Sequence, residues 1–213
     1  MPRPIPQLAS AFARQAASAS SLIGRLETAS TIVGRSNRQA RIGPPSLESI
    51  YEYAFLRVFI AWEVLLEQTF VRLMCGYAGL SGQAPLRPGR TYMKSIAAAE
   101  VVILGTKDYV LWHNVDTVTR RSNGYFVNSN FEQVLKSSHS RLEHFAALRH
   151  RIAHAQSHAE QQFDAATMAL AGRRYRGARP GRILRDWTRT SPPERWFNKI
   201  IDEMVGLAGQ VCA

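Results

Sequence analysis

Apolar residues recur at intervals of three and four along much of this chain, which is the spacing of one face of an α-helix. The pattern runs through residues 7–34 and is strongest in residues 50–74. Residues 41–45, which include two prolines, interrupt it, and Ser46 is a suitable residue to begin the second helix. We therefore predict an N-terminal amphipathic helix and, after a break, a longer helix in the centre of a bundle. The apolar positions of the longer helix are Tyr51, Ala54, Phe55, Val58, Phe59, Trp62, Leu65, Leu66, Phe70, Leu73 and Met74.

The same spacing predicts four further helices. They cover residues 92–104, 131–155, 160–170 and 193–210, and the second of them is expected to bend near residues 137–138. The connections 105–130 and 172–190 are rich in Asn, Gly, Pro or Arg and are expected to be irregular. No stretch sustains the alternation of a half-buried strand. The sequence therefore predicts an all-α fold: an antiparallel helical bundle of four to five core helices with additional N- and C-terminal helices.

The chain is strongly basic. It carries 27 basic and 16 acidic residues, a formal net charge of +11. A surface with this charge attracts polyanions such as RNA. The charge is uneven, because seven arginines and one acid, Asp186, lie between residues 173 and 189. Since 23 of the basic residues are arginine, the composition bias of a GC-rich genome is an alternative explanation, and both explanations stay open.

Several classes of protein are excluded by composition. The longest apolar run is too short to cross a bilayer, and the N-terminus lacks the apolar block of a secretory signal. Residues 1–41 hold six arginines and the single acid Glu27, a composition shared with organellar transit peptides, although we favour an ordinary amphipathic helix. The two cysteines, Cys75 and Cys212, suit a reduced cytoplasmic protein. No nucleotide-binding loop, catalytic triad or redox motif is present.

The most informative segment lies near the end of a long apolar-faced helix. Leu148 and Ile152 are four residues apart and are expected to hold this turn against the core. Arg149, Arg151 and His154 must then point elsewhere. Arg149 and His154 lie roughly 140° apart around an ideal helix, so they flank the buried stripe without stacking. One copy alone makes a poor active site, whereas two copies near a two-fold axis would bring both pairs into one cleft.

Such a cleft suits RNA transesterification. A neutral imidazole can take the proton of a ribose 2′-hydroxyl, because its pKa lies near the working pH. A guanidinium stays charged and offers forked donors to phosphate oxygens as negative charge builds on them. No metal ion or cofactor is needed for this reaction. The expected products carry a 2′,3′-cyclic phosphate and a 5′-hydroxyl.

The segment resembles a known family motif. Arg149-x4-His154, in the form Arg-His-Arg-Ile-Ala-His, resembles the R-x(4–6)-H motif of HEPN domains, and His150 fills the place of a polar residue that often follows the arginine. Ala61-Trp62-Glu63 and residues 126–131 also resemble stand-alone bacterial HEPN proteins, in particular the RNA-ligase-associated group. The resemblance covers about residues 46–190. It implies a division into an N-terminal helix with its break, residues 1–45, and a HEPN-like bundle, residues 46–213.

The resemblance implies a helical bundle that dimerises through its motif-bearing helices and acts as an endoribonuclease, as a toxin or in defence against phage. Arg149 would then steady the phosphate and His154 would act as acid or base. His150 would be an auxiliary polar residue, and Glu63 would orient the motif from a neighbouring helix. The implied partners are RNA, a second copy of the chain, and an antitoxin or neighbouring defence protein.

Other interpretations of the segment remain open. His150, His154 and His158 recur every four residues, so a continuous helix would align them as metal ligands. Cationic residues at a helix end also complement the helix dipole without any further role. A non-catalytic HEPN-type module that binds RNA or a protein, and an antitoxin or immunity component, are the alternative functions.

The arginine-rich segment is a candidate RNA-binding surface. Arg173, Arg174 and Arg176, together with Arg151 on the motif helix, are the predicted contacts to the RNA backbone. Two aromatic residues of the segment, Tyr175 and Trp187, are predicted to stack on bases. A solvated basic connection is the alternative.

Overall fold

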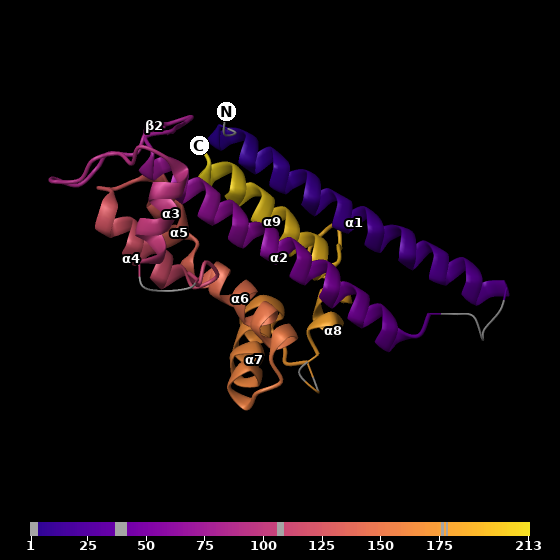
Figure 1. Ribbon diagram of the computed structural model, residues 1–213. Coiled ribbons are helices and arrows are strands. Elements are labelled where there is room, and N and C mark those ends of the chain that lie inside the picture. Colours follow the sequence, from indigo (N-terminus) through magenta and orange to yellow (C-terminus); the bar gives the residue numbers. More distant parts are fainter. Residues whose placement is uncertain (1–3, 37–41, 106–108, 176, 178) are drawn as a thin grey trace. The chain divides into compact units, whose positions relative to one another are not determined.

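The fold is all-α, as the hydrophobic pattern predicts (Figure 1). The structure, a computed structural model, describes residues 4–36, 42–105, 109–175, 177 and 179–213. Within them lie nine helices and one short hairpin. The helices are α1 (Ile5–Ser36), α2 (Pro44–Met74), α3 (Ile96–Leu104), α4 (Val115–Tyr125), α5 (Asn130–Ser137), α6 (His139–Ala153), α7 (Ser157–Ala171), α8 (Pro180–Arg185) and α9 (Trp196–Val211), and the hairpin pairs β1 (Ala78–Gly79) with β2 (Gly82–Gln83). None of the helices in the described residues has the length and apolar character needed to span a bilayer.

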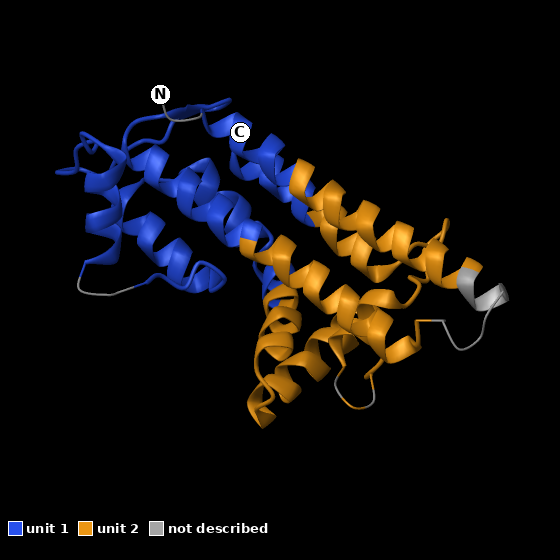
Figure 2. Cartoon of the chain, turned by 45° about the vertical axis from the view of Figure 1, so that its right-hand side comes forward, with its two compact units in different colours: residues 1–13, 61–143, 204–213 blue, residues 14–60, 144–203 orange. Residues whose placement is uncertain are grey.

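The chain divides into two compact units, which Figure 2 distinguishes by colour. Unit 1 contains Met1–Ala13, Ala61–Glu143 and Met204–Ala213, and unit 2 contains Arg14–Ile60 and His144–Glu203. The helices α1, α2, α6 and α9 each contribute residues to both units. The predicted boundary after residue 45 lies inside unit 2 and does not coincide with the division into these units. It stays a prediction.

Most predicted helices are found close to their predicted bounds. The helix α1 covers the predicted 7–34, and α2 begins at Pro44, two residues before the predicted start at Ser46. Both prolines lie in the first turn of α2, where the missing N–H has no intrahelical partner to lose. The predicted bend near residues 137–138 is a break, because Ser138 separates α5 from α6.

Two expectations of irregular structure are wrong. The connection 105–130 contains α4, whose first turn is capped by Asn114: its Oδ1 accepts from the Thr117 backbone N–H at 2.7 Å. The arginine-rich segment contains α8, which begins with Pro180 at its first turn. Both helices are short, and α4 buries only small apolar and hydroxyl side chains, so neither produces a strong apolar stripe in the sequence.

Phe70 of α2 is the centre of the core of unit 1. Its ring lies 5.8 Å from that of Trp112, 5.7 Å from that of Phe126 and 5.7 Å from that of Phe131, measured between ring centroids. These rings come from the segments before and after α4 and from α5. Tilted and edge-on aromatic pairs of this kind add to the free energy gained from burial alone. The cluster therefore holds α4 and α5 against α2.

Unit 2 combines an aromatic core with a charged network. Tyr51 of α2 packs edge-on against Phe197 of α9, with 5.5 Å between centroids. Arg195 Nη2 lies 3.1 and 3.2 Å from the two carboxylate oxygens of Glu27 on α1, and Arg185 Nε lies 3.5 Å from one of them. Burial and the Glu27 carboxylate raise the pKa of Tyr51, so its phenol stays neutral. One carboxylate therefore joins α1 to the segment between α8 and α9.

The helix α8 packs directly on the backbone of α2. Gly181 N–H donates to Glu52 Oε1 at 2.8 Å, and Arg179 Nη1 lies 3.7 Å from Glu48 Oε2. A Cβ at Gly181 would lie 2.8 Å from Glu48 Cα and closer still to the Glu48 carbonyl. Only glycine permits this approach of two backbones.

We predict that Gly181→Ala destabilises the protein by about 2 kcal/mol or more, because the added methyl group would displace α8 from the first turns of α2. Unfolding in urea measures the change. Gly209→Ala is the matched control, since a Cβ at Gly209 on α9 meets open space, and alanine there is expected to stabilise by up to about 1 kcal/mol. Equal stability of the wild type and Gly181→Ala would contradict the observed packing.

A second prediction concerns Glu67 of α2 in unit 1. Burial raises the pKa of Glu67, and the carboxylate of Glu100 on α3 raises it further. A group whose pKa is higher in the folded state stabilises the fold at low pH, and this stability is lost as the pH rises through the folded-state pKa. Glu67→Gln should therefore raise the melting temperature near pH 7, and the gain should shrink near pH 4, about the pKa of an unfolded glutamate. The control variant Asp202→Asn, at an exposed site on α9, should leave the melting temperature nearly unchanged at either pH. A lower melting temperature of Glu67→Gln than of the wild type near pH 7 would refute the prediction.

Candidate functional site

The predicted catalytic turn is formed by the last residues of α6. Leu148 is fully buried and anchors this turn in unit 2, while Ile152 is only partly buried. The helix ends at Ala153, yet the His154 backbone N–H still donates to the carbonyl of His150 at 2.9 Å. His154 therefore continues the helical turn by one residue, although it is outside the helix.

The turn brings basic side chains together. The rings of His150 and His154 lie 4.7 Å apart, inclined at 50°. His154 is exposed, whereas Arg149 and His150 are half-buried. An exposed imidazole beside a second imidazole can exchange protons with a ligand, and Arg149, five residues before His154, supplies a guanidinium that can bind a phosphate group. The structure thus places three of the four predicted catalytic residues at one helix end.

The fourth, Glu63, lies on α2 in unit 1, and the motif residues lie in unit 2. Glu63 Oε1 is 2.7 Å from Nδ1 of His113, and both side chains are largely buried. The residue pattern of the sequence does not indicate this contact between α2 and the segment before α4. The predicted role of Glu63 in orienting the motif stays a prediction.

Arg151 has an acidic neighbour within unit 2. Its side chain is largely buried, and Nη2 lies 4.0 Å from Oε2 of Glu160 on α7. The pair connects the end of α6 to the first turns of α7. The predicted contact of Arg151 with RNA stays a prediction.

The histidine repeat is not aligned on one helix. The helix α6 ends at Ala153 and α7 begins at Ser157, so His150 and His158 belong to different helices. Within the described residues, His150, His154 and His158 do not gather into a group of possible metal ligands.

A different group in unit 1 has ligand atoms within 4.8 Å of one another: Asp116, His139 and Glu143. His139 Nε2 lies 2.8 Å from Asp116 Oδ1, and Nδ1 lies 3.6 Å from Glu143 Oε2. Both carboxylates are exposed, and exposed acidic groups of this kind are common without a metal ion.

The arginine-rich segment is partly neutralised. Arg173 forms an ion pair with Asp186, and the hydroxyl of Tyr175 donates to the same carboxylate at 2.6 Å. The Arg173 guanidinium also covers the Tyr175 ring, 4.9 Å from its centroid. Tyr175 is 5% exposed, so the prediction that its ring stacks on a base is wrong. Arg174 is exposed, and the predicted contact Arg176 lies outside the described residues.

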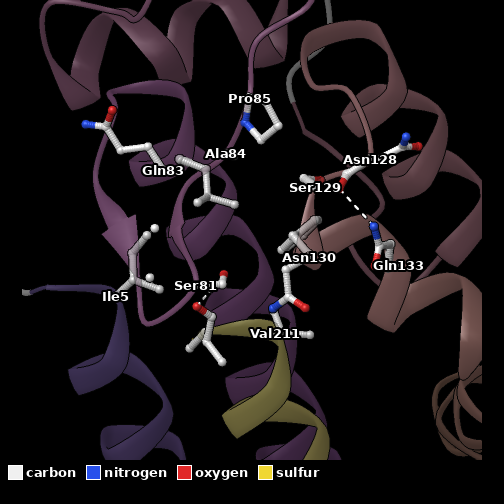
Figure 3. Close-up of a pocket in the computed structure, with 16 residues that line it drawn as sticks. Ile5, Ser81, Gln83, Ala84, Pro85, Asn128, Ser129, Asn130, Gln133 and Val211 are labelled. Atoms are coloured by element: carbon white, nitrogen blue, oxygen red, sulfur yellow. Dashed lines mark hydrogen bonds between the residues drawn. The ribbon is translucent and has the colours of Figure 1, made fainter.

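A cleft of about 300 Å³ opens in unit 1 (Figure 3). Ile5 and Gln83 lie on one side of it, and Asn128 and Gln133 lie on the other. Gln133 Nε2 donates to the Asn128 carbonyl at 2.9 Å. The side chains that line the cleft are apolar groups, hydroxyls, amides and the thiol of Cys212, and no acidic, histidine or basic side chain is among the described lining residues. Burial raises the pKa of the Cys212 thiol, so the cleft offers mainly hydrogen bonds.

No family model, curated protein or solved structure matches this chain.

Proposed function

We propose that this chain is a metal-independent endoribonuclease of the HEPN type, with Arg149 and His154 as its reacting groups. The observation that carries the proposal is the end of α6, where an exposed His154 lies beside His150, 4.7 Å away between ring centroids, and five residues after Arg149. The resemblance of Arg149-x4-His154 to the HEPN motif supports the same assignment. RNA is the proposed substrate because the chain is strongly basic and because these groups suit a phosphodiester with a neighbouring hydroxyl.

The reaction follows from the chemistry of these side chains. A neutral His154 takes the proton of the ribose 2′-hydroxyl, and the 2′-oxygen attacks the adjacent phosphorus. The bond from phosphorus to the 5′-oxygen breaks, and that oxygen leaves with a proton from an imidazolium. Arg149 binds the non-bridging oxygens, on which negative charge builds in the transition state. The products are a 2′,3′-cyclic phosphate and a 5′-hydroxyl.

A second copy of the chain completes the proposed site. One imidazole cannot accept the first proton and donate the second in the same step. Two copies packed around a two-fold axis would place two Arg149 and two His154 side chains in one cleft, so that one His154 acts as base and the other as acid. His150 and Glu63 would orient these groups.

The proposed biological role comes from the family resemblance. HEPN proteins commonly act as toxins or in defence against phage, and we extend this role to the chain. It would act in the cytoplasm, and an antitoxin or a neighbouring defence protein would hold its activity back.

We expect Arg149→Ala and His154→Ala each to lower RNA cleavage in EDTA by about 100-fold or more, the usual effect of losing a charge-stabilising group or a general base. The assay compares purified variants on a mixed RNA pool. His158→Ala is the matched control, because this exposed histidine lies nearby on α7 and has no role in the proposal. Cleavage at the wild-type rate by both alanine variants would refute the assignment. RNA binding without any cleavage by the wild type would favour the non-catalytic module.

The composite site makes a separate prediction. The double variant Arg149→Ala/His154→Ala should lower the activity of wild-type chains when the two are unfolded together and refolded as a mixture, because mixed dimers hold a single His154 in the shared cleft and lack either the base or the acid. With equal amounts of the two chains and random pairing, the activity per wild-type chain should fall to about half. His158→Ala chains refolded with the wild type serve as the control and should leave the activity per chain unchanged. Full activity per wild-type chain in the mixture with the double variant would show that each copy acts alone.

A further inference from the structure

Trp187 is an exposed aromatic residue in an arginine-rich segment. Of the four tryptophans, Trp62 and Trp112 are buried and Trp196 is half-buried, whereas Trp187 is 53% exposed. A large aromatic side chain in solvent leaves a flat apolar surface that a planar ligand can cover.

The backbone around Trp187 is held in a closed turn. Trp187 and Arg195 form an isolated antiparallel bridge. Thr188 N–H donates to the Glu194 carbonyl at 2.7 Å, and Trp196 N–H donates to the Asp186 carbonyl at 2.9 Å. The side chain of Thr188 is buried, which directs Trp187 to the opposite, exposed face of this extended stretch. A ligand that binds Trp187 would therefore meet a pre-ordered ring, at a small cost in conformational entropy.

A fixed cation covers one face of the indole. The guanidinium of Arg195 lies 4.1 Å from the centroid of the Trp187 ring. Arg195 is itself held by the Glu27 carboxylate and by the Arg185 carbonyl, to which Nη1 donates at 2.6 Å. Because the stack keeps Arg195 on one side, the exposed surface of the ring is available on the other. The indole is thus a supported platform for a second planar group.

The surroundings favour an anionic ligand. Arg189 follows Trp187 by two residues, where the chain begins to bend, and its side chain is exposed. Arg182 on α8 is exposed as well. Neither arginine forms an ion pair with any described residue. The two nearby acids each form an ion pair with another basic residue: Asp186 pairs with Arg173, and Glu194 Oε1 lies 3.7 Å from Lys199 Nζ.

We propose that Trp187 stacks on an unpaired nucleobase and that Arg189 binds the phosphate next to it, so that the chain prefers single-stranded RNA. The ligand class rests on the proposed function, but the site does not require cleavage. Every base offers a flat face, so stacking on tryptophan tolerates any sequence. Bases of a duplex are already stacked on their neighbours and cannot use this surface without unpairing. Unpaired segments of RNA are therefore the substrate that this surface would select.

The test measures the dissociation constant of the His154→Ala protein, in which cleavage is suppressed, for a labelled RNA of about twelve uridines and for a duplex RNA of equal length. Trp187→Ala should weaken binding of the single strand by about tenfold, the effect of removing one stacked base, and should change duplex binding by less than about twofold. Trp187→Phe should recover most of the loss, because phenylalanine also stacks. Tyr53→Ala, which removes another exposed aromatic residue of unit 2, should change neither constant.

Unchanged binding of the single strand by Trp187→Ala would overturn the proposal, and so would an equal loss for both RNAs in a protein with the wild-type circular dichroism spectrum. Absence of RNA binding by the parent protein would overturn it too. The two proposals can fail separately. Binding through Trp187 by a wild-type chain that cleaves no RNA would refute only the nuclease, and cleavage by Trp187→Ala that equals the wild type at every RNA concentration would refute only the platform.

Discussion

The carboxylate of Glu27 lies between two guanidinium groups, and much of unit 2 depends on this contact. It bonds Arg195 through both oxygens and lies within ion-pair distance of Arg185, so α1 is joined to the segment that links α8 to α9. Loss of the carboxylate would leave two partly buried positive charges beside the phenol of Tyr51. The free-energy cost of breaking such a pair is larger than the cost of breaking a fully exposed one. The same contact fixes Arg195 against the indole of Trp187. A structural ion pair therefore also shapes the surface that we propose for RNA.

The proposed chemistry and the proposed binding surface share unit 2. The turn after α6 supplies the imidazole and guanidinium groups, and the segment after α7 supplies the exposed tryptophan and arginines. Several arginines of the basic segment are matched by acids, among them Arg173 with Asp186 and Arg179 with Glu48. The positive charge that this segment offers to any polyanion is consequently smaller than the composition suggests and is centred on fewer residues, such as Arg174, Arg182 and Arg189.

The sequence predicts the long helices because a wide apolar stripe has a clear period, as in α2. The pattern does not predict α4 and α8. The buried side chains of α4 are small, and α8 is only six residues long. The position of the candidate site could be predicted from the sequence, because Leu148 anchors the last turns of α6, on which Arg149 lies and which His154 directly follows. Its catalytic role stays a prediction. The sequence could not show which arginines form ion pairs, because their acidic partners are distant along the chain. Glu27 and Arg195, for example, are 168 residues apart. The burial of Tyr175 and the exposure of Trp187 likewise depend on tertiary contacts that the sequence does not show. One signal was usable, because Glu27 is an isolated acid in a basic N-terminal stretch.

The central claim is that Arg149 and His154 cleave RNA by attack of the ribose 2′-oxygen, without a metal ion. Mass spectrometry of the fragments produced by the purified protein in EDTA tests it most directly, because the chemical ends of the products record which oxygen attacked. We predict a 2′,3′-cyclic phosphate, or the phosphate formed by its hydrolysis, on one new end and a hydroxyl on the 5′ end. Fragments with 5′-phosphate and 3′-hydroxyl ends, or cleavage that stops when metal ions are chelated, would contradict the account.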